Sequence, residues 1–194
     1  MLNILIFGAP GSGKGTQSAF IKEHYNLDHV STGDMLRAEI KAGSEVGKKA
    51  AAIIERGNLV SDEIISEMLA RRVKAEKDDK DGFIFDGYPR TLHQAETLEE
   101  ILAEHHTAVT ALVELQVPEE QLITRIIERG KVSGRADDNE ASVKERLNVY
   151  HRETEPVIGF YKRQNKVIAI DGTGSIEEIT GRIVNAIDTF RIKK

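Results

Sequence analysis

The chain of 194 residues contains no cysteine and no tryptophan. Without cysteine it can form no disulfide, no thiolate zinc site and no cysteine nucleophile, which suits a reducing compartment. No stretch approaches the roughly 18 apolar residues that a membrane span needs. The first apolar run is short, has no basic leader and ends in a glycine loop, unlike a secretory signal. We therefore expect a cytoplasmic protein with no membrane partner.

A broad basic surface is also missing. Lys and Arg number 27 against 32 Asp and Glu, a formal net charge of −5, so we expect no nucleic-acid partner and only local anion sites. With 40% apolar and 30% charged residues, the composition is that of an ordinary globular chain. The length fits one domain with room for an embedded subdomain. The charged run 74–81 is predicted to be a solvated connection.

Short apolar runs alternate with helical patterns along most of the chain. The run from Leu2 to Phe7 is continuous, as in a strand buried on both faces of a parallel sheet, and Gly8 stops it. Alternation of strands with helices of about ten or more residues predicts an α/β fold of three layers. Its five-stranded parallel sheet would bind ligands at the carboxyl ends of the strands. The other strands are predicted at residues 29–31 (weakly), 83–85, 109–117 and 166–170.

Several helix ends carry recognisable signals. Pro118 with two following glutamates begins a helix that Gly130 is expected to end. Ser175, with Glu178 three residues later, predicts a capping box at the start of the last helix.

Two segments depart from the alternation. Residues 31–60 carry mostly helix signals, with Ser44 and Ser61 as caps and Gly43 and Gly57 as ends, which predicts a small helical subdomain beside the sheet. Residues 130–138, with the sequence GKVSGRADD, combine glycines with charges of both signs. They are predicted to form a mobile loop between two helices.

The segment from Gly8 to Lys14 has the spacing of a phosphate-binding loop between a buried strand and a helix. Glycines let backbone N–H groups turn inward, the helix N-terminus adds partial positive charge, and the lysine supplies a full one. Gly15 stands where the general pattern has Ser or Thr, and Thr16 follows. Which hydroxyl approaches a metal ion is therefore left open. The loop residues predicted to bind a triphosphate are Gly11, Ser12, Gly13, Lys14, Gly15 and Thr16.

A series of motifs resembles the adenylate kinase family: GAPGSGKGT at 8–16, STGDMLR at 31–37, GNLVSDE at 57–63, FDGYPRT at 85–91, GRADD and KERL. Their order and spacing extend through nearly the whole chain. The resemblance implies a core of residues 1–30, 61–129 and 139–194, a nucleoside monophosphate subdomain at 31–60 and a short lid at 130–138. It also implies reversible transfer of a phosphoryl group from MgATP to AMP, giving two ADP.

The resemblance assigns roles residue by residue. Arg37 and Arg90 would hold the AMP phosphate, with Thr32 and Gln94 near its base. Arg129 would lie against the ATP adenine, and the backbone of Gly174 would lie near the same base. The full AMP set is Thr32, Arg37, Asn58, Leu59, Val60, Gly87, Tyr88, Pro89, Arg90, Gln94, Arg135 and Arg146. The catalytic set is Lys14, Asp86, Arg90, Arg125, Arg135 and Arg146.

Both the resemblance and the residue chemistry predict transfer without a catalytic base. An AMP phosphate oxygen is already ionised at neutral pH, so positioning and charge neutralisation supply the rate. The six histidines show no ligand spacing, and we interpret all of them as structural or exposed. We expect no metal ion held directly by side chains. Mg²⁺ would be held mainly by phosphates and water, with Asp86 and Thr16 as outer partners.

Five residues separate Arg129 from Arg135, which is typical of a short lid, and without cysteine we expect no zinc. Two alternatives stay open. A UMP or CMP kinase tends to have Ala where Thr32 stands, and a phosphate-loop switch would hydrolyse its triphosphate slowly. Against the switch, the chain has no Asn-Lys-x-Asp guanine motif. We expect the nucleotides ATP, AMP and ADP as partners, no obligate protein partner, and a monomer.

Overall fold

The structure, a computed structural model, describes residues 1–75, 80–135 and 137–192. It is built on a five-stranded parallel sheet with the strand order β2-β3-β1-β4-β5. All five predicted strands are present, including the weak one. Residues 76–79 of the predicted charged connection and residue 136 of the predicted lid lie outside the described residues. The strands are β1 (Ile4–Phe7), β2 (Asp28–Ser31), β3 (Phe83–Asp86), β4 (Ala111–Gln116) and β5 (Val167–Asp171).

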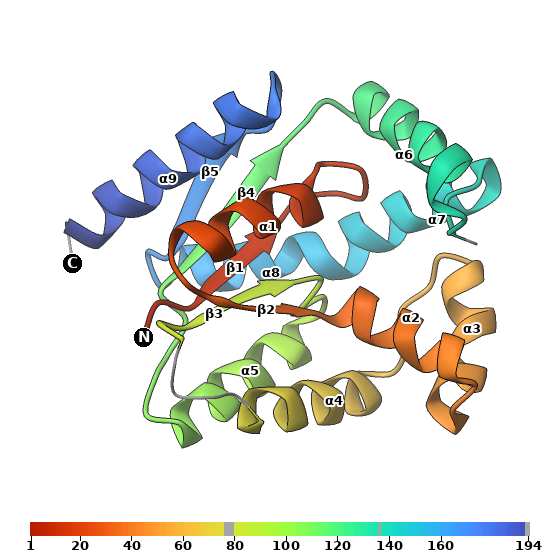
Figure 1. Ribbon diagram of the computed structural model, residues 1–194, viewed down its shortest axis with the longest axis horizontal. Coiled ribbons are helices and arrows are strands. Elements are labelled where there is room, and N and C mark those ends of the chain that lie inside the picture. The colour runs from red at the N-terminus through yellow and green to blue at the C-terminus, as the bar shows by residue number, and fades with distance from the viewer. Residues whose placement is uncertain (76–79, 136, 193–194) are drawn as a thin grey trace.

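Helices connect the strands and cover both faces of the sheet (Figure 1). None of the helices in the described part of the chain is long and apolar enough to cross a membrane. The helices are α1 (Lys14–His24), α2 (Thr32–Ala42), α3 (Glu45–Glu55), α4 (Asp62–Lys74), α5 (Leu92–Glu104), α6 (Glu119–Ser133), α7 (Glu140–Val149), the π-helical segment η1 (Tyr150–Thr154), α8 (Glu155–Lys162) and α9 (Ile176–Ile192).

The core has one layer on each face of the sheet, because successive strand residues point to opposite faces. Leu5 and Phe7 of β1 belong to a buried cluster that includes residues of α4, α5 and α8. Ile4 and Ile6 belong to a second cluster, which packs against α1 and α9. Both faces of β1 are therefore covered, as its continuous apolar run predicted.

Side-chain caps begin two helices, α3 and α9, as the sequence predicted. Ser44 Oγ accepts a hydrogen bond of 3.0 Å from the backbone N–H of Gly47. Ser175 and Glu178 form the expected capping box, with bonds of 2.8 and 3.2 Å. Ser61 occupies the cap position of α4, but its side chain makes no capping hydrogen bond.

The prediction that Gly130 ends a helix is wrong. Helix α6 continues through this residue to Ser133, and Gly134 ends it in the left-handed conformation with φ 62°. A Cβ atom at Gly130 would lie 2.3 Å from the backbone oxygen of Asp138. Gly130 is therefore required by the close approach of the returning chain. The predicted loop 130–138 is consequently helical over its first four residues.

Helices α2 and α3 project beside the sheet, next to the end of β2 (Figure 1). Their backbones come close at Gly47, where an added Cβ would lie 2.2 Å from the backbone oxygen of Glu39. No side chain fits at this crossing, so α2 and α3 pack directly on each other.

Two helical glycines give a matched prediction for stability. At exposed Gly181 in α9, an added Cβ meets no described atom within 4 Å, so Gly181→Ala should raise the free energy of unfolding by about 0.5–1 kcal/mol. Gly47→Ala, despite the same gain in helix propensity, should lower it by about 1–3 kcal/mol because of the clash with Glu39. Urea unfolding of both variants measures the two signs. A stabilised Gly47→Ala would contradict the packing described here.

Candidate active site

The loop between β1 and α1 has a backbone that only glycine readily adopts. Gly8, Gly11 and Gly13 have φ angles of 146°, 84° and 95°, where a Cβ atom is disfavoured. The ammonium group of Lys14 folds back over the loop and donates to the backbone oxygens of Gly8 at 2.7 Å and Ala9 at 3.1 Å. The predicted phosphate-binding sequence thus forms a compact turn at the N-terminus of α1.

A cavity of about 490 Å³ opens in front of this loop, a volume that suits a ligand site. Most residues that the sequence analysis singled out line it. They come from the loop and the start of α1, from α2, from the segment after α3, from the end of β3 and the segment after it, from α5, from α6 and α7, and from the connection between α6 and α7. The lining residues from the predicted set are Gly11, Gly13, Lys14, Gly15, Thr16, Thr32, Arg37, Asn58, Leu59, Val60, Asp86, Gly87, Tyr88, Pro89, Arg90, Gln94, Arg129, Arg135 and Arg146.

Three predicted residues do not line the cavity in this structure. Ser12 is 1% exposed, and its hydroxyl has no hydrogen-bond partner among the described residues. Arg125 makes long hydrogen bonds to Gln121 and to the backbone oxygen of Gly172 instead. Gly174 lies beside the capping box of α9, where an added Cβ would meet Glu178.

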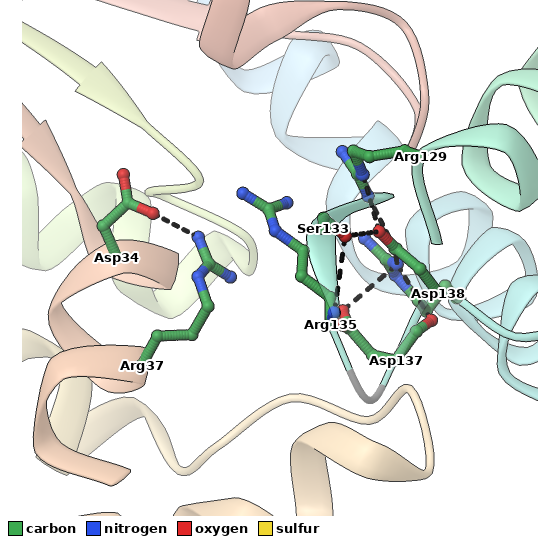
Figure 2. Close-up of polar contacts among 8 residues, drawn as sticks. Asp34, Arg37, Arg129, Ser133, Arg135, Asp137 and Asp138 are labelled. Atoms are coloured by element: carbon green, nitrogen blue, oxygen red, sulfur yellow. Dashed lines mark hydrogen bonds and ion pairs between the residues drawn. The ribbon is translucent and has the colours of Figure 1, made fainter. Parts of the chain in front are cut away.

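Asp138 is the centre of an ion-pair cluster that the sequence analysis missed (Figure 2). Arg129 donates to both its oxygens, with Nε–Oδ2 at 2.6 Å and Nη2–Oδ1 at 2.7 Å. Arg146 Nη1 lies 2.7 Å from Oδ1 as well, and it also donates to the backbone oxygen of Asp137. The Asp138 side chain is 0% exposed. The only signal in the sequence was its position in GRADD, where we interpreted it as loop composition.

The two arginines keep Asp138 ionised. Burial by itself works against the charged form and would raise the pKa of this carboxyl. The hydrogen bonds and positive charges of Arg129 and Arg146 outweigh burial, so the pKa lies below its ordinary value of 3.8. The pairing joins the last helical turns of α6 to the last turn of α7 and so holds the short connection between them.

Arg37 and Arg135 point toward one another from opposite sides of the cavity (Figure 2). Arg37 pairs with Asp34 in its own helix. Burial, followed by the positive charges of Arg37 and Arg129, lowers the pKa of the Arg135 guanidinium. Two cations therefore face one space in mutual repulsion, which an anion between them would relieve.

The centre of the cavity has the same excess of positive charge. Burial lowers the pKa of Lys14 to about 8; Asp86 opposes this shift, and Arg90 and Arg146 add to it. Burial, followed by the charge of Arg146, likewise lowers the pKa of Arg90. Arg90 is held in place by a bond of 2.7 Å from its Nε to the backbone oxygen of Gly87. Bound phosphates would relieve this repulsion too.

Asp86 lies at the carboxyl end of β3, next to the start of α1. Its Oδ2 would be 3.5 Å from a Cβ atom at Gly15, and it lies 3.8 Å from His29 Nε2. Burial would raise the pKa of Asp86, but the nearby His29 ring and the charge of Lys14 hold it below its ordinary value. His29 therefore lines the cavity beside a carboxylate. We had interpreted it only as structural or exposed, and no spacing in the sequence marked its position.

Oxygen donors are the ligands that Mg²⁺ prefers, and the Asp86 carboxylate and the Thr16 hydroxyl both line the cavity. No group of three His, Cys, Asp or Glu side chains able to hold a metal occurs among the described residues. This donor set fits an ion that is coordinated mainly by phosphates and water, with Asp86 and Thr16 beside it.

The segment that follows β3 is braced against α2. Thr32 Oγ1 and Arg90 Nε both donate to the backbone oxygen of Gly87, each at 2.7 Å. The backbone N–H of Arg90 donates to Gln94 Oε1 at 2.7 Å. Thr154 Oγ1, from η1, donates to the backbone oxygen of Arg90 at 2.9 Å. The segment is thus held by α5, which follows it directly, and by α2 and η1, which are distant in sequence.

A model of the adenylate kinase family matches residues 6–166 of the chain. The adenylate kinase of Parabacteroides distasonis is 54% identical over 191 residues, which cover 98% of this chain and 100% of that protein. The adenylate kinase of Bacteroides thetaiotaomicron is 53% identical over 188 residues, covering 97% and 99%. That of Porphyromonas gingivalis is 51% identical over 191 residues, covering 98% of each chain.

The Asp138 cluster predicts a pH-dependent contribution to stability. Asp138→Asn should lower the free energy of unfolding by about 1–3 kcal/mol at pH 7, because two guanidinium groups lose their shared carboxylate. Since the folded pKa lies below 3.8, this difference should persist above that pH and vanish as the pH falls through the folded pKa. Urea unfolding between pH 2.5 and 7 measures it.

The matched control is Glu45→Gln, which removes an exposed ion pair with Lys48 and should cost no more than about 0.5 kcal/mol at any pH. Wild type and Asp138→Asn should differ in their free energy of unfolding at pH 7, and this difference should shrink by pH 2.5. Equal free energies at pH 7, or an undiminished difference at pH 2.5, would contradict the stabilising role of the ionised Asp138.

Proposed function

The chain belongs to the adenylate kinase family, and from this premise we propose how its cavity joins two nucleotides. As an adenylate kinase, the protein reversibly transfers a phosphoryl group from ATP to AMP, giving two ADP. The observation that carries the proposal is that a phosphate-binding loop and several arginines from distant segments face the same cavity.

ATP binds on the side of the loop after β1. The backbone N–H groups of the loop and the N-terminus of α1 surround its phosphates, and Lys14 exchanges its two backbone carbonyl partners for phosphate oxygens. Arg129 lies beside the same nucleotide, and the Gly174 backbone lies nearer the base. The ATP set is Gly11, Ser12, Gly13, Lys14, Gly15, Thr16, Arg129 and Gly174.

AMP binds on the opposite side, against α2 and the segment after β3. Arg37 and Arg90 hold its phosphate, because guanidinium groups pair with phosphate oxygens through two hydrogen bonds. Gln94 and Thr32 lie near its base. The AMP set is Thr32, Arg37, Asn58, Leu59, Val60, Gly87, Tyr88, Pro89, Arg90, Gln94, Arg135 and Arg146.

The transfer step needs no base among these residues. An ionised AMP phosphate oxygen forms a bond to the γ-phosphorus of ATP, and the bond from that phosphorus to the β–γ bridging oxygen breaks in line with it. The electron pair leaves with ADP. Lys14, Arg90, Arg135 and Arg146 stabilise the charge on the transferred group. Arg125 joins them only when its guanidinium leaves the backbone oxygen of Gly172.

Mg²⁺, when bound, neutralises charge on the β- and γ-phosphates of ATP. Asp86 and Thr16 would orient the water around it. We expect no zinc in the lid, because the chain has no cysteine and a short lid is held here by the ion pairs of Asp138.

Residues 31–60 and 130–138 act as a nucleoside monophosphate subdomain and a lid on a core of residues 1–30, 61–129 and 139–194. Arg37 belongs to the first and Arg135 to the second, and both face the cavity. Phosphates between them favour closure, which excludes the water that would otherwise hydrolyse ATP. The protein works as a cytoplasmic monomer without an obligate protein partner.

The reverse reaction tests the activity with one nucleotide. The purified protein, incubated with ADP and Mg²⁺, should produce ATP and AMP in equal amounts, because each transfer makes one of each. Chromatography of the products measures both. Free phosphate in place of ATP would contradict the proposal, and a panel of AMP, UMP, CMP and GMP as acceptors that favoured a pyrimidine would overturn the acceptor assignment.

Lys14→Met separates the catalytic role of the lysine from its structural one. The charge stabilises the transferred group, so kcat should fall by at least about 100-fold. The pKa of about 8 shows that the positive charge is disfavoured in the folded protein, so the melting temperature should stay the same or rise. Turnover by coupled assay and thermal melting measure the two effects. Unchanged turnover would remove Lys14 from the mechanism.

A further inference from the structure

Asp62, the first residue of α4, lies outside the residues that line the cavity but contacts one of them. We infer that Asp62 determines the purine specificity of the acceptor site by fixing the orientation of the Gln94 side-chain amide. The inference rests on the proposed placement of the AMP base beside Gln94. It concerns a positioning residue, because Asp62 acts through the glutamine.

The two ends of the Gln94 amide have different and unambiguous partners. Nε2 donates to Asp62 Oδ1 at 2.7 Å, and Oε1 accepts from the backbone N–H of Arg90 at 2.7 Å. An ionised carboxylate can only accept a hydrogen bond, and a backbone N–H can only donate one. The nitrogen must therefore lie toward Asp62 and the oxygen toward Arg90. The side chain is also buried, with 2% of the residue exposed.

Asp62 is itself held by the cap of α5. Thr91 Oγ1 donates its one proton to Asp62 Oδ2 at 2.8 Å. Thr91 Oγ1 in turn accepts a hydrogen bond of 3.1 Å from the backbone N–H of Gln94. Each carboxylate oxygen thus has its own donor, and the aspartate cannot turn without losing one. The network fixes the amide from outside the cavity.

The fixed amide retains one N–H and one lone pair for a ligand, since an amide has two donors and two acceptor positions. Adenine presents an acceptor at N1 and a donor at its 6-amino group, which match that N–H and that oxygen. Hypoxanthine and guanine reverse both features, with a donor at N1 and an acceptor at O6. A glutamine that could rotate by half a turn would serve either kind of base equally well.

Rotation of Gln94 is what the network opposes. A turned amide would place its oxygen against the Asp62 carboxylate and its NH₂ group against the Arg90 N–H. Two hydrogen bonds would be replaced by two repulsive contacts in a buried position, where unpaired polar groups are costly. The free energy needed to turn the amide therefore sets the preference of the site for adenine over the 6-oxopurines.

Asp62→Asn tests the inference with AMP and inosine monophosphate as acceptors. Asparagine has the same shape but can either donate or accept, so Asp62 no longer opposes a turn of the Gln94 amide and only the backbone N–H of Arg90 does. The ratio of kcat/KM for AMP to that for inosine monophosphate should fall by at least about tenfold. The change should come from a higher KM for AMP and a higher kcat/KM for inosine monophosphate, with the KM for ATP unchanged.

Glu63→Gln is the matched control, because it removes the same charge from the next residue of α4 at an exposed position. In this variant the ratio of kcat/KM for AMP to that for inosine monophosphate should stay within about twofold of wild type. Asp62→Glu, which keeps an acceptor-only carboxylate, should retain most of the discrimination. It also provides a second test if Asp62→Asn folds poorly. Equal ratios in wild type and Asp62→Asn, or a ratio as low in Asp62→Glu as in Asp62→Asn, would overturn the inference.

Gln94→Leu distinguishes failure of this inference from failure of the proposed acceptor site. If this variant keeps the wild-type ratio, the base does not lie beside Gln94, and both proposals are wrong. If Gln94→Leu abolishes discrimination while Asp62→Asn preserves it, the acceptor site stands and the role of Asp62 is overturned. Support requires that both single variants lower the ratio and that adding Asp62→Asn to Gln94→Leu lowers it no further.

Discussion

The proposed function depends on one feature, the positive charge that is collected in a partly buried cavity. Burial and the neighbouring arginines lower the pKa of Lys14, and burial with Arg146 lowers that of Arg90. The carboxylates of Asp86 and Asp138 offset part of this charge, and Asp138 is already shared by two guanidinium groups. The remaining repulsion favours ligands with several negative charges. The repulsion among these cations becomes binding energy when phosphates enter.

The sheet makes this concentration of charge possible. Because all five strands are parallel, the segments that leave their carboxyl ends meet on one side. The loop before α1, the start of α2 and the segment after β3 therefore reach the same cavity from distant parts of the chain. Helices on both faces of the sheet keep these ends in place, since they bury both sides of β1.

Features that depend on local sequence could be predicted well. The continuous apolar run of β1, the glycine spacing of the loop and the capping box at Ser175 each determine their own conformation, and the structure confirms all three. Gly130 was misassigned because its small size is needed by Asp138, a contact that requires the return of the chain. A glycine in the sequence does not show by itself whether it ends a helix or makes room for another segment of the chain.

The polar networks could not be predicted for the same reason. Nothing in the sequence pairs Asp62 with Gln94 or joins Asp138 to Arg146, since these contacts depend on how helices from different segments are placed. Arg125 and Arg129 lie four residues apart in α6, where side chains share a helix face. The structure turns Arg129 to Asp138 and Arg125 to Gly172, so a shared helix face did not give a shared partner.

The contact at Gly47 has a mechanical consequence. With backbone packed on backbone at Gly47, there is no side chain at this point between α2 and α3 that could shear or repack. A joint of this kind resists sliding of one helix along the other. In the closure proposed above, the two helices would therefore carry Arg37 as one rigid body, with the bending confined to the residues that join them to β2 and α4.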